Sequence, residues 1–351
     1  MIAGENPQLF ENRKADHIRL ALDEAMQSTG MSGLEQVQLL HEAFPELDFA
    51  DVDIATTLFS KPIASPLFIS SMTAGHSGSV DLNMILARVS EKRNWAMGVG
   101  SQRRQLTDEK ADQEWSHIRK SCPGTRFFGN IGLAQLIRTD VAQIRRLADT
   151  LQAEAMIVHA NPLQECMQPE GTPQFSGGLK ALARLVKELG LPVIVKETGC
   201  GFSAATLARI AGLGVAAVDV SGLGGTHWGR IEGGRSRKGE KLQVASETFR
   251  NWGVATVDSL LNGLKQPHDF DLWASGGVRS GLDAAKLLAL GASFVGLAKP
   301  LIQAALEGEL ALDQCMELFE YELKTAMFCT GSKTIKDLQN QKVEKREWER
   351  K

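Results

Sequence analysis

Two features that would direct a protein to a membrane are missing from this sequence. No apolar run reaches the roughly 20 residues that a membrane-spanning helix needs. Residues 1–14 are polar and lack the apolar core of a signal peptide. The 351 residues carry a formal net charge of −3, so no strong positive field would attract nucleic acid or an anionic membrane. We expect a soluble, cytoplasmic protein whose partners are small molecules, with no nucleic acid and no membrane among them.

Cysteine is scarce and unpatterned. The five cysteines are odd in number, widely spaced and without a CxxC pair: Cys122, Cys166, Cys200, Cys315 and Cys329. This spacing favours free thiols in a reducing compartment over disulfides or a zinc site. No GxGxxG motif stands between a predicted strand and a predicted helix. The glycine-rich residues 222–225 lead into a predicted loop instead of a helix. The sequence therefore shows no resident dinucleotide site.

From about residue 60 onward, short apolar runs alternate with segments of helical period. The eight runs cover residues 66–73, 96–101, 127–132, 155–160, 192–198, 216–221, 271–276 and 294–299. Their continuous hydrophobicity is typical of parallel strands covered on both faces. An α/β protein of this kind forms either a closed barrel or an open doubly wound sheet. Eight units favour the (β/α)8 or TIM barrel.

The chain outside these units divides into two end segments. We predict an N-terminal extension over residues 1–60 that contributes to the active site, a cofactor-binding barrel over 61–335, and a charged C-terminal tail over 336–351. Residues 301–351 are expected to be helical and to end in a charged run, 342–351, that is solvated or frayed. Residues 222–244 contain seven glycines, and we predict a long loop there. Such a loop is uncommon unless it is a lid, a binding loop or disordered, and in a barrel it would emerge beside the active site.

Polar side chains follow almost every predicted strand. They are Ser71, Met72 and Thr73; Ser101 and Arg103; Asn130; His159 and Asn161; Lys196 and Thr198; Ser221; Ser275 and Arg279; and Lys299. Because parallel strands of a barrel end at one face, this pattern predicts a single polar pocket at the barrel mouth.

Segments that contain glycine lie at the ends of the seventh and eighth strands, at residues 274–281 and 296–300. Barrels commonly bind phosphate there, through backbone N–H groups and helix N-termini. A phosphorylated cofactor fits this pattern, and the alternative is two tight turns that use glycine for geometry alone. Lys196 ends an apolar strand and would suit the N1/C2=O edge of a flavin. The alternative interpretation of Lys196 is an ion pair with a neighbouring carboxylate such as Glu197.

Two further segments suggest ligands for a charged substrate. Glu165 is a candidate ligand for a hard cation, since magnesium prefers carboxylate and phosphate oxygens. Arg13, Lys14 and His17 form either a solvated basic turn or a cluster that closes over a diphosphate.

Together these segments resemble the type 2, flavin-using isopentenyl-diphosphate isomerases, from Asn12 to about Gly331. The matching motifs are NRKADH at 12–17, SMTAG at 71–75, GVGSQR at 98–103, HANPLQE at 159–165, VKETG at 195–199, GGTHW at 224–228 and ASGGVR at 274–279. The last motif is general to FMN barrels, whereas the first and the NPLQE segment are more particular. Two positions depart from the family pattern, Ala74 and Thr172, and neither is expected to touch residues assigned to the chemistry.

The resemblance implies a 1,3-allylic proton shift between isopentenyl and dimethylallyl diphosphate, with FMN, NADPH and Mg²⁺, in a homo-oligomer (tetramer or octamer). It implies a flavin site formed by Ser71, Met72, Thr73, Ser101, Asn130, Lys196, Ser221, Thr226, Gly276, Gly277, Arg279, Ala298 and Lys299. Substrate would contact Arg13, Lys14, His17, Arg103, His159, Asn161 and Gln164. The catalytic residues would be Gln164, Lys196, Trp228 and Glu232, and Glu165 would bind magnesium.

The implied reaction involves no net oxidation, so we interpret reduced FMN as an acid–base catalyst that Lys196 keeps anionic. A rival hypothesis is a flavin 2-hydroxy-acid oxidase or dehydrogenase, with His227 as base and Arg230 as carboxylate clamp. A second rival is a flavin-binding sensor or scaffold protein built on an inactive barrel.

Overall fold

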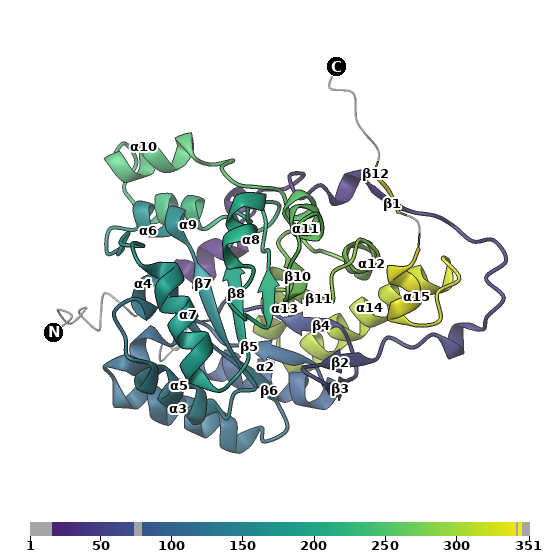
Figure 1. Cartoon of the computed structure of the whole chain (residues 1–351), viewed down its shortest axis with the longest axis horizontal. Coiled ribbons are helices and arrows are strands. Elements are labelled where there is room, and N and C mark those ends of the chain that lie inside the picture. Colours follow the sequence, from purple (N-terminus) through teal and green to yellow (C-terminus); the bar gives the residue numbers. More distant parts are fainter. Residues whose placement is uncertain (1–15, 74–78, 342, 346–351) are drawn as a thin grey trace.

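The computed structural model describes residues 16–73, 79–341 and 343–345, and a closed barrel of eight parallel strands lies at its centre (Figure 1). The strands are β4 (Leu67–Ile69), β5 (Ala96–Gly98), β6 (Arg126–Gly132), β7 (Ala155–Ala160), β8 (Val193–Glu197), β9 (Ala217–Asp219), β10 (Asp271–Ser275) and β11 (Phe294–Leu297). Each strand pairs with the next along the chain, and β11 returns to β4. The predicted barrel is confirmed and the open sheet is excluded. Seven predicted runs each contain one strand, and β6 begins one residue before its run.

Large aromatic side chains alternate with small residues inside the barrel. Phe68, Phe128, Trp273 and Phe294 form one buried cluster with strand alanines, and the ring centroids of Phe128 and Trp273 lie 5.7 Å apart. A hairpin of β2 (Thr56–Leu58) and β3 (Lys61–Ile63) adds apolar side chains to this cluster. The barrel is therefore a packed core, and a site can form only at its ends.

Helices surround the barrel and bury their apolar stripes against it. They are α2 (Val80–Arg93), α3 (Glu109–Ser121), α5 (Val141–Leu151), α7 (Gly178–Leu189), α8 (Ala204–Ile210), α11 (Thr256–Leu264), α12 (Gly281–Ala289), α13 (Lys299–Glu307) and α14 (Glu309–Phe328). The hydroxyls of Ser203 and Ser280 cap α8 and α12. In the described ranges, no helix is long and apolar enough to cross a membrane.

The two end segments of the chain pack against each other. The N-terminal segment contains a helix over residues 16–22, then η1 (Glu24–Met26), η2 (Leu34–Gln36), β1 (Val37–Leu39) and η3 (Phe49–Asp51). Near the other end, α15 (Ile335–Gln339) is followed by β12 (Val343–Lys345), which pairs antiparallel with β1. Of the run 342–351 that we predicted to be solvated or frayed, residues 343–345 form β12, and residues 342 and 346–351 lie outside the described ones.

The glycine-rich segment 222–244 is not the long loop that we predicted. It contains α9 (Trp228–Arg235) and the start of α10 (Lys241–Thr248), and both lie beside α6 (Pro162–Met167) in Figure 1. A Cβ atom on Gly233 would meet Ser246 Oγ at 1.7 Å, and one on Gly229 would meet Leu163 Cδ2 at 2.9 Å. These glycines allow α9 to pack closely on its neighbours, so here they indicate tight helix packing.

Three short helices connect strands near the carboxyl ends: η5 (Gln102–Leu106), α4 (Leu133–Leu136) and α6. Each begins directly after a barrel strand or within a few residues of its end. They bring side chains such as Arg103 and Gln164 to the barrel mouth.

The aromatic cluster makes a prediction about stability. Phe128→Ala removes a fully buried ring and is expected to lower the free energy of unfolding by about 3–5 kcal/mol. Phe44→Ala is the matched control, because Phe44 is 79% exposed and its loss should change the value by about 0.5 kcal/mol or less. Denaturant unfolding of the full chain measures both, and equal effects would contradict a packed barrel interior.

Candidate active site

A pocket of about 1180 Å³, open mouth included, lies at the carboxyl ends of the barrel strands. Segments that end or follow all eight strands line it. The structure places these predicted site residues in its wall: His17, Ser71, Met72, Ser101, Arg103, Asn130, His159, Asn161, Gln164, Glu165, Lys196, Ser221, Thr226, Trp228, Gly276, Gly277, Arg279, Ala298 and Lys299.

Of the four remaining predicted residues, two are not described and two do not line this wall. Arg13 and Lys14 lie outside the described residues. Thr73 is buried behind the pocket, where its hydroxyl donates to Asn83 Oδ1 at 2.5 Å. Glu232 is fully buried behind His17 and Gln164. Sequence reasoning missed the lining residues Ser70, Gly100, Gln135, Gln168 and Gly199, whereas Val278 and Gly296 lie in the two segments predicted to bind phosphate. Ser70 and the glycines give no distinct chemical signal. Gln135 and Gln168 lie in the segments after β6 and β7, so the argument from polar residues near strand ends could have selected them.

The glycines after β10 form a cradle of backbone atoms. Gly276 and Gly277 have φ values of 102° and 84°, which glycine adopts readily. A Cβ atom on Gly277 would lie 2.6 Å from Gly224 O. Arg279 and Lys299 line the same wall, and Lys299 begins α13. Backbone N–H groups, a helix N-terminus and two cations suit a phosphate group.

One buried hydroxyl at the mouth is without a partner. Ser71 Oγ has no hydrogen-bond partner among the described residues, and Ser71 lines the pocket. A buried polar atom of this kind is normally satisfied by a ligand or water. The pocket therefore fits a polar, phosphorylated cofactor such as FMN.

Lys196 is paired with a carboxylate, but the partner is Asp219 rather than Glu197. Lys196 Nζ lies 3.0 Å from Asp219 Oδ2 and donates to Ser275 Oγ at 3.1 Å. Lys196 and Asp219 are register partners on the neighbouring strands β8 and β9. The ammonium therefore faces the pocket with its charge already balanced from behind.

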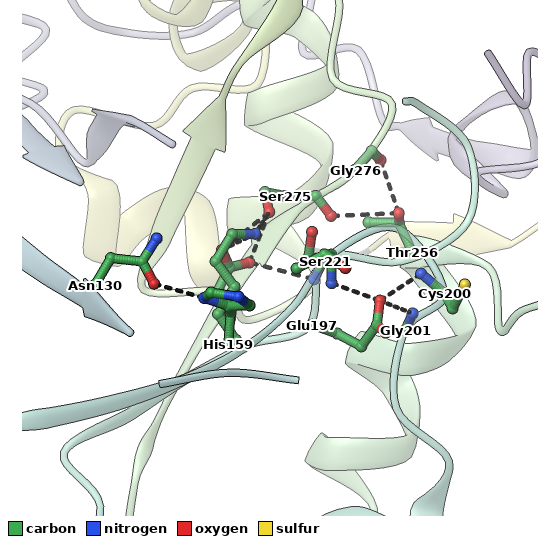
Figure 2. Close-up of polar contacts among 12 residues, drawn as sticks. Asn130, His159, Glu197, Cys200, Gly201, Ser221, Thr256, Ser275 and Gly276 are labelled. Atoms are coloured by element: carbon green, nitrogen blue, oxygen red, sulfur yellow. Dashed lines mark hydrogen bonds and ion pairs between the residues drawn. The ribbon is translucent and has the colours of Figure 1, made fainter. Parts of the chain in front are cut away.

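The Glu197 side chain binds the backbone of the loop that follows β8. One carboxylate oxygen accepts from the N–H groups of Thr198 at 2.6 Å, Cys200 at 2.5 Å and Gly201 at 3.1 Å, and Figure 2 shows the last two contacts. Burial raises the pKa of Glu197 to about 7, although these N–H groups and the Lys196 charge act in the opposite direction. Glu197 thus shapes the loop that carries Thr198 and Gly199 to the pocket.

Asn130 fixes the orientation of His159 (Figure 2). Asn130 Nδ2 donates to Val99 O at 3.0 Å, so Asn130 Oδ1 is the atom that faces His159 Nδ1, at 2.8 Å. An amide oxygen accepts only, so the proton lies on His159 Nδ1. The His159 ring is therefore held in one tautomer when it is neutral.

Glu232 is the centre of a buried polar network. Its carboxylate accepts from His17 Nε2 at 2.8 Å, Gln164 Nε2 at 3.1 Å and Arg235 at 2.5 Å. Burial alone would raise the pKa of Glu232, but the hydrogen bonds and charges of these partners lower it to about 2. Arg235 also contacts Glu170. The network ties the N-terminal segment, α6 and α9 together around an ionised carboxylate.

A second cluster lies at the start of α6. Asn161 Nδ2 donates to Gln164 Oε1 at 2.9 Å and to Glu165 Oε1 at 3.3 Å. Thr172 donates to Glu165 Oε2 through both its N–H and its hydroxyl, at 2.5 and 3.1 Å. The expectation that position 172 would not touch residues assigned to the chemistry is therefore wrong. Asn161 Oδ1 is buried without a partner among the described residues, and this oxygen beside a carboxylate fits a hard cation.

The N-terminal segment packs across the pocket mouth. Arg279 donates to Gln27 Oε1 at 2.8 Å, and Lys299 Nζ lies 2.5 Å from Glu24 Oε1. Thr226 forms an isolated backbone bridge with Gln27. His17 and Trp228 meet edge to face, with ring centroids 5.1 Å apart. Residues 16–27 are therefore anchored to the pocket wall, and His17 is part of it.

His227 and Arg230 are directed away from the pocket. His227 is fully buried, accepts from the Arg230 N–H through Nδ1, and has Nε2 3.2 Å from Trp252 O. Burial lowers the pKa of His227. The Arg230 guanidinium donates to Gln27 O, to Arg250 O at 2.7 Å and to Asn251 Oδ1 at 2.6 Å. The base and the clamp that a hydroxy-acid oxidase requires are thus not available at this position.

Glu197 makes a prediction about pH dependence. Because its folded-state pKa is raised from 4.5 to about 7, the native state retains a proton that the unfolded chain loses between these pH values. Its contribution to stability is present below pH 4.5 and is lost as pH rises to 7, by roughly 3 kcal/mol. Glu197→Gln keeps an acceptor oxygen and should remove this dependence, as measured by unfolding between pH 5 and 8. The exposed Glu188→Gln is the control, and equal pH slopes in the wild type and Glu197→Gln would contradict the assignment.

Comparisons with known proteins agree on one family. The family model for FMN-dependent dehydrogenases matches residues 119–345. A Bdellovibrio bacteriovorus protein named isopentenyl-diphosphate delta-isomerase is 54% identical over 343 residues, which is 97% of this chain and 99% of that protein. A protein of the same name from Legionella pneumophila strain Paris is 55% identical over 329 residues, 94% of this chain and 96% of the relative.

Solved structures with this fold include two of mandelate oxidase. A variant with 2-hydroxy-phenylacetamide gives a TM-score of 0.65 at 18% identity, covering 96% of this chain and 98% of the other. A complex with (S)-2-phenylpropionate gives 0.63 at 18% identity, with the same coverage. At this identity the likeness shows the fold alone. The chain-long similarity at over 50% identity decides the family: the chain belongs to the isopentenyl-diphosphate delta-isomerases, within the FMN-dependent dehydrogenase family.

Proposed function

We propose that the chain interconverts isopentenyl diphosphate and dimethylallyl diphosphate by a 1,3-allylic proton shift, with FMN as its cofactor, in isoprenoid precursor biosynthesis. The observation that carries this proposal is the identity of more than half of the residues with named isomerases over 97% of the chain. The pocket supports it, because it combines a phosphate cradle, a paired lysine and a second cluster of polar groups on α6.

FMN would be held by the residues of the strand ends. Gly276, Gly277, Arg279, Ala298 and Lys299 suit its phosphate, and Ser71, Met72, Ser101, Asn130, Lys196, Ser221 and Thr226 would surround its rings, with Thr73 supporting them from behind. When bound and reduced, FMN would supply an acid–base group beside the alkene. Lys196 would contribute a fixed positive charge next to it.

The substrate would lie between the flavin site and α6. Its diphosphate would contact Arg103, His159 and Asn161 from the barrel, and His17 with Arg13 and Lys14 from the N-terminal segment. A protonated His159 can donate to a phosphate oxygen only through Nε2, because Asn130 occupies Nδ1. Trp228 lines the pocket and would offer an apolar surface to the hydrocarbon end.

Gln164 and Glu232 are the remaining proposed catalytic residues. Glu232 stays ionised at neutral pH because its pKa is about 2, so it is an acceptor and not an acid there. Gln164 donates to Glu232 and accepts from Asn161. A neutral amide has no useful pKa near 7. We therefore assign to Gln164 the orientation of groups around the reacting carbon, with Glu232 as the charge behind it.

Two further components complete the proposal. Glu165 and the unpaired oxygen of Asn161 would hold Mg²⁺. Among the described residues no group of three His, Cys, Asp or Glu side chains could hold a metal ion, so substrate phosphate oxygens would complete the coordination. NADPH would act as a transient reductant. A cytoplasmic homo-oligomer, a tetramer or octamer, and the division of the chain at residues 60 and 335 belong to the same proposal.

The test is anaerobic incubation of the protein with FMN, NADPH, Mg²⁺ and isopentenyl diphosphate in heavy water. We expect deuterated dimethylallyl diphosphate without net consumption of NADPH beyond flavin reduction. Oxygen or dye reduction coupled to a 2-hydroxy acid, with no isomerisation, would overturn the proposal. Bound FMN without turnover of either substrate would instead support a sensor or scaffold role.

Gln164→Ala tests the role of the α6 cluster. It should lower kcat about a hundredfold, with FMN still bound, because Glu232 keeps His17 and Arg235 but no longer contacts the substrate side. Steady-state kinetics and flavin absorbance measure the two effects. Gln143→Ala, an exposed glutamine on α5, is the control and should leave both unchanged. Near-normal turnover of Gln164→Ala would exclude it from the catalytic machinery.

A further inference from the structure

Three buried side chains at the ends of adjacent strands form a connected group, of which two line the pocket and one lies behind them. Lys196 lies on β8, Asp219 ends β9 and Ser275 ends β10. Ser275 Oγ donates to both Asp219 oxygens, at 2.8 and 2.9 Å, and accepts from Lys196 Nζ. Lys196 and Ser275 line the pocket, whereas Asp219 does not and is 1% exposed. Asp219 can therefore act on a bound ligand only through its two neighbours.

Both oxygens of the Asp219 carboxylate have polar partners. Besides Ser275 and Lys196, it accepts from the Ser221 N–H at 3.3 Å. Ser221 lines the pocket and has a φ of 36°, in the left-handed region that favours glycine. A buried ion pair is retained only when hydrogen bonds satisfy its remaining atoms. This pair meets that condition, so both charges are held in fixed positions.

We propose that Asp219 is a positioning residue of the cofactor site: it fixes the Lys196 ammonium at the pocket wall and offsets its charge, and thereby sets how strongly the site favours reduced FMN. This inference rests on the proposed function only in that FMN binds in this pocket. It concerns a carboxylate to which the proposed reaction assigns no role.

The physical consequence follows from the sign of the charges. A reduced flavin is more electron-rich than an oxidised one, so an uncompensated ammonium beside it would favour reduction strongly in a poorly solvated pocket. Asp219 adds a negative charge 3.0 Å from that ammonium and weakens the preference. A flavin anion that is held less tightly also remains a stronger base, which suits proton exchange with an alkene.

Asp219→Asn is the direct test, because the amide oxygen keeps an acceptor for Ser275 and Ser221, while the negative charge is removed and an NH2 group takes the place of the oxygen beside Lys196. In the FMN-loaded protein at pH 7, reduction should become about tenfold more favourable, which is a rise of about 30 mV in the two-electron midpoint potential. Equilibration with a reference dye measures it. Asp149→Asn, with the same charge change on the exposed face of α5, should leave the potential unchanged. A potential that is unaltered or lower in Asp219→Asn would overturn the proposal.

A second variant carries the test if Asp219→Asn does not retain FMN or does not fold. Lys196→Gln combined with Asp219→Asn replaces the ion pair by two neutral amides. The matched comparison is Lys196→Gln alone, which leaves the negative charge of Asp219 without its cationic partner. Flavin reduction should be about tenfold more favourable in the double variant than in Lys196→Gln. Equal equilibria in these two variants would show that the Asp219 charge has no effect on the flavin, and the proposal would fail.

These readouts are independent of isomerase activity. If the wild type binds FMN and does not isomerise, the proposed reaction fails while the potentials still decide the role of Asp219. If the wild type isomerises and Asp219→Asn has an unchanged potential, only the inference about Asp219 fails. A wild-type protein that takes up no FMN would overturn both.

Discussion

Closure of eight parallel strands is the constraint on which the rest of the structure depends. Once β11 pairs with β4, every strand ends at the same mouth and the interior is filled by Phe68, Phe128, Trp273 and Phe294. A polar side chain at a strand end then has no place except the mouth or the layer directly behind it. The pocket is thus a consequence of closure, and the loops determine what it binds.

This constraint explains why the architecture and most of the pocket could be predicted from the sequence. Strand runs have a recognisable pattern, and a polar residue at the end of each run is placed by topology alone. Pairings across the barrel could not be predicted in this way, because they depend on register. Asp219 is 23 residues from Lys196 and meets it only because β8 and β9 pair at that position. Glu197 was nearer in sequence, but adjacent residues on a strand point to opposite faces, and that rule already argued against it. Glycine content was misleading at residues 222–244, where glycines allow helix packing.

Several charged side chains around the pocket are paired with opposite charges. Lys196 is paired with Asp219, Lys299 with Glu24, and Glu232 with Arg235 and His17. Two of these pairs join the barrel to the N-terminal segment, so residues 16–27 are held in place by the charges of the site that they cover. A site assembled in this way has its dipoles oriented before a ligand arrives, and preorganisation of this kind is where much of the electrostatic stabilisation of a transition state originates.

The same barrel in mandelate oxidase shows that the fold does not determine the reaction. What distinguishes the two chemistries must lie in the groups that reach the mouth. In this chain His227 caps α9 and Arg230 binds backbone carbonyls, so both are used to hold α9 against the N-terminal segment. That packing in turn directs Trp228 to the pocket and places Glu232 behind Gln164. The two residues that the oxidase hypothesis required thus support α9, which carries Trp228 to the pocket wall, and neither of them lines the pocket.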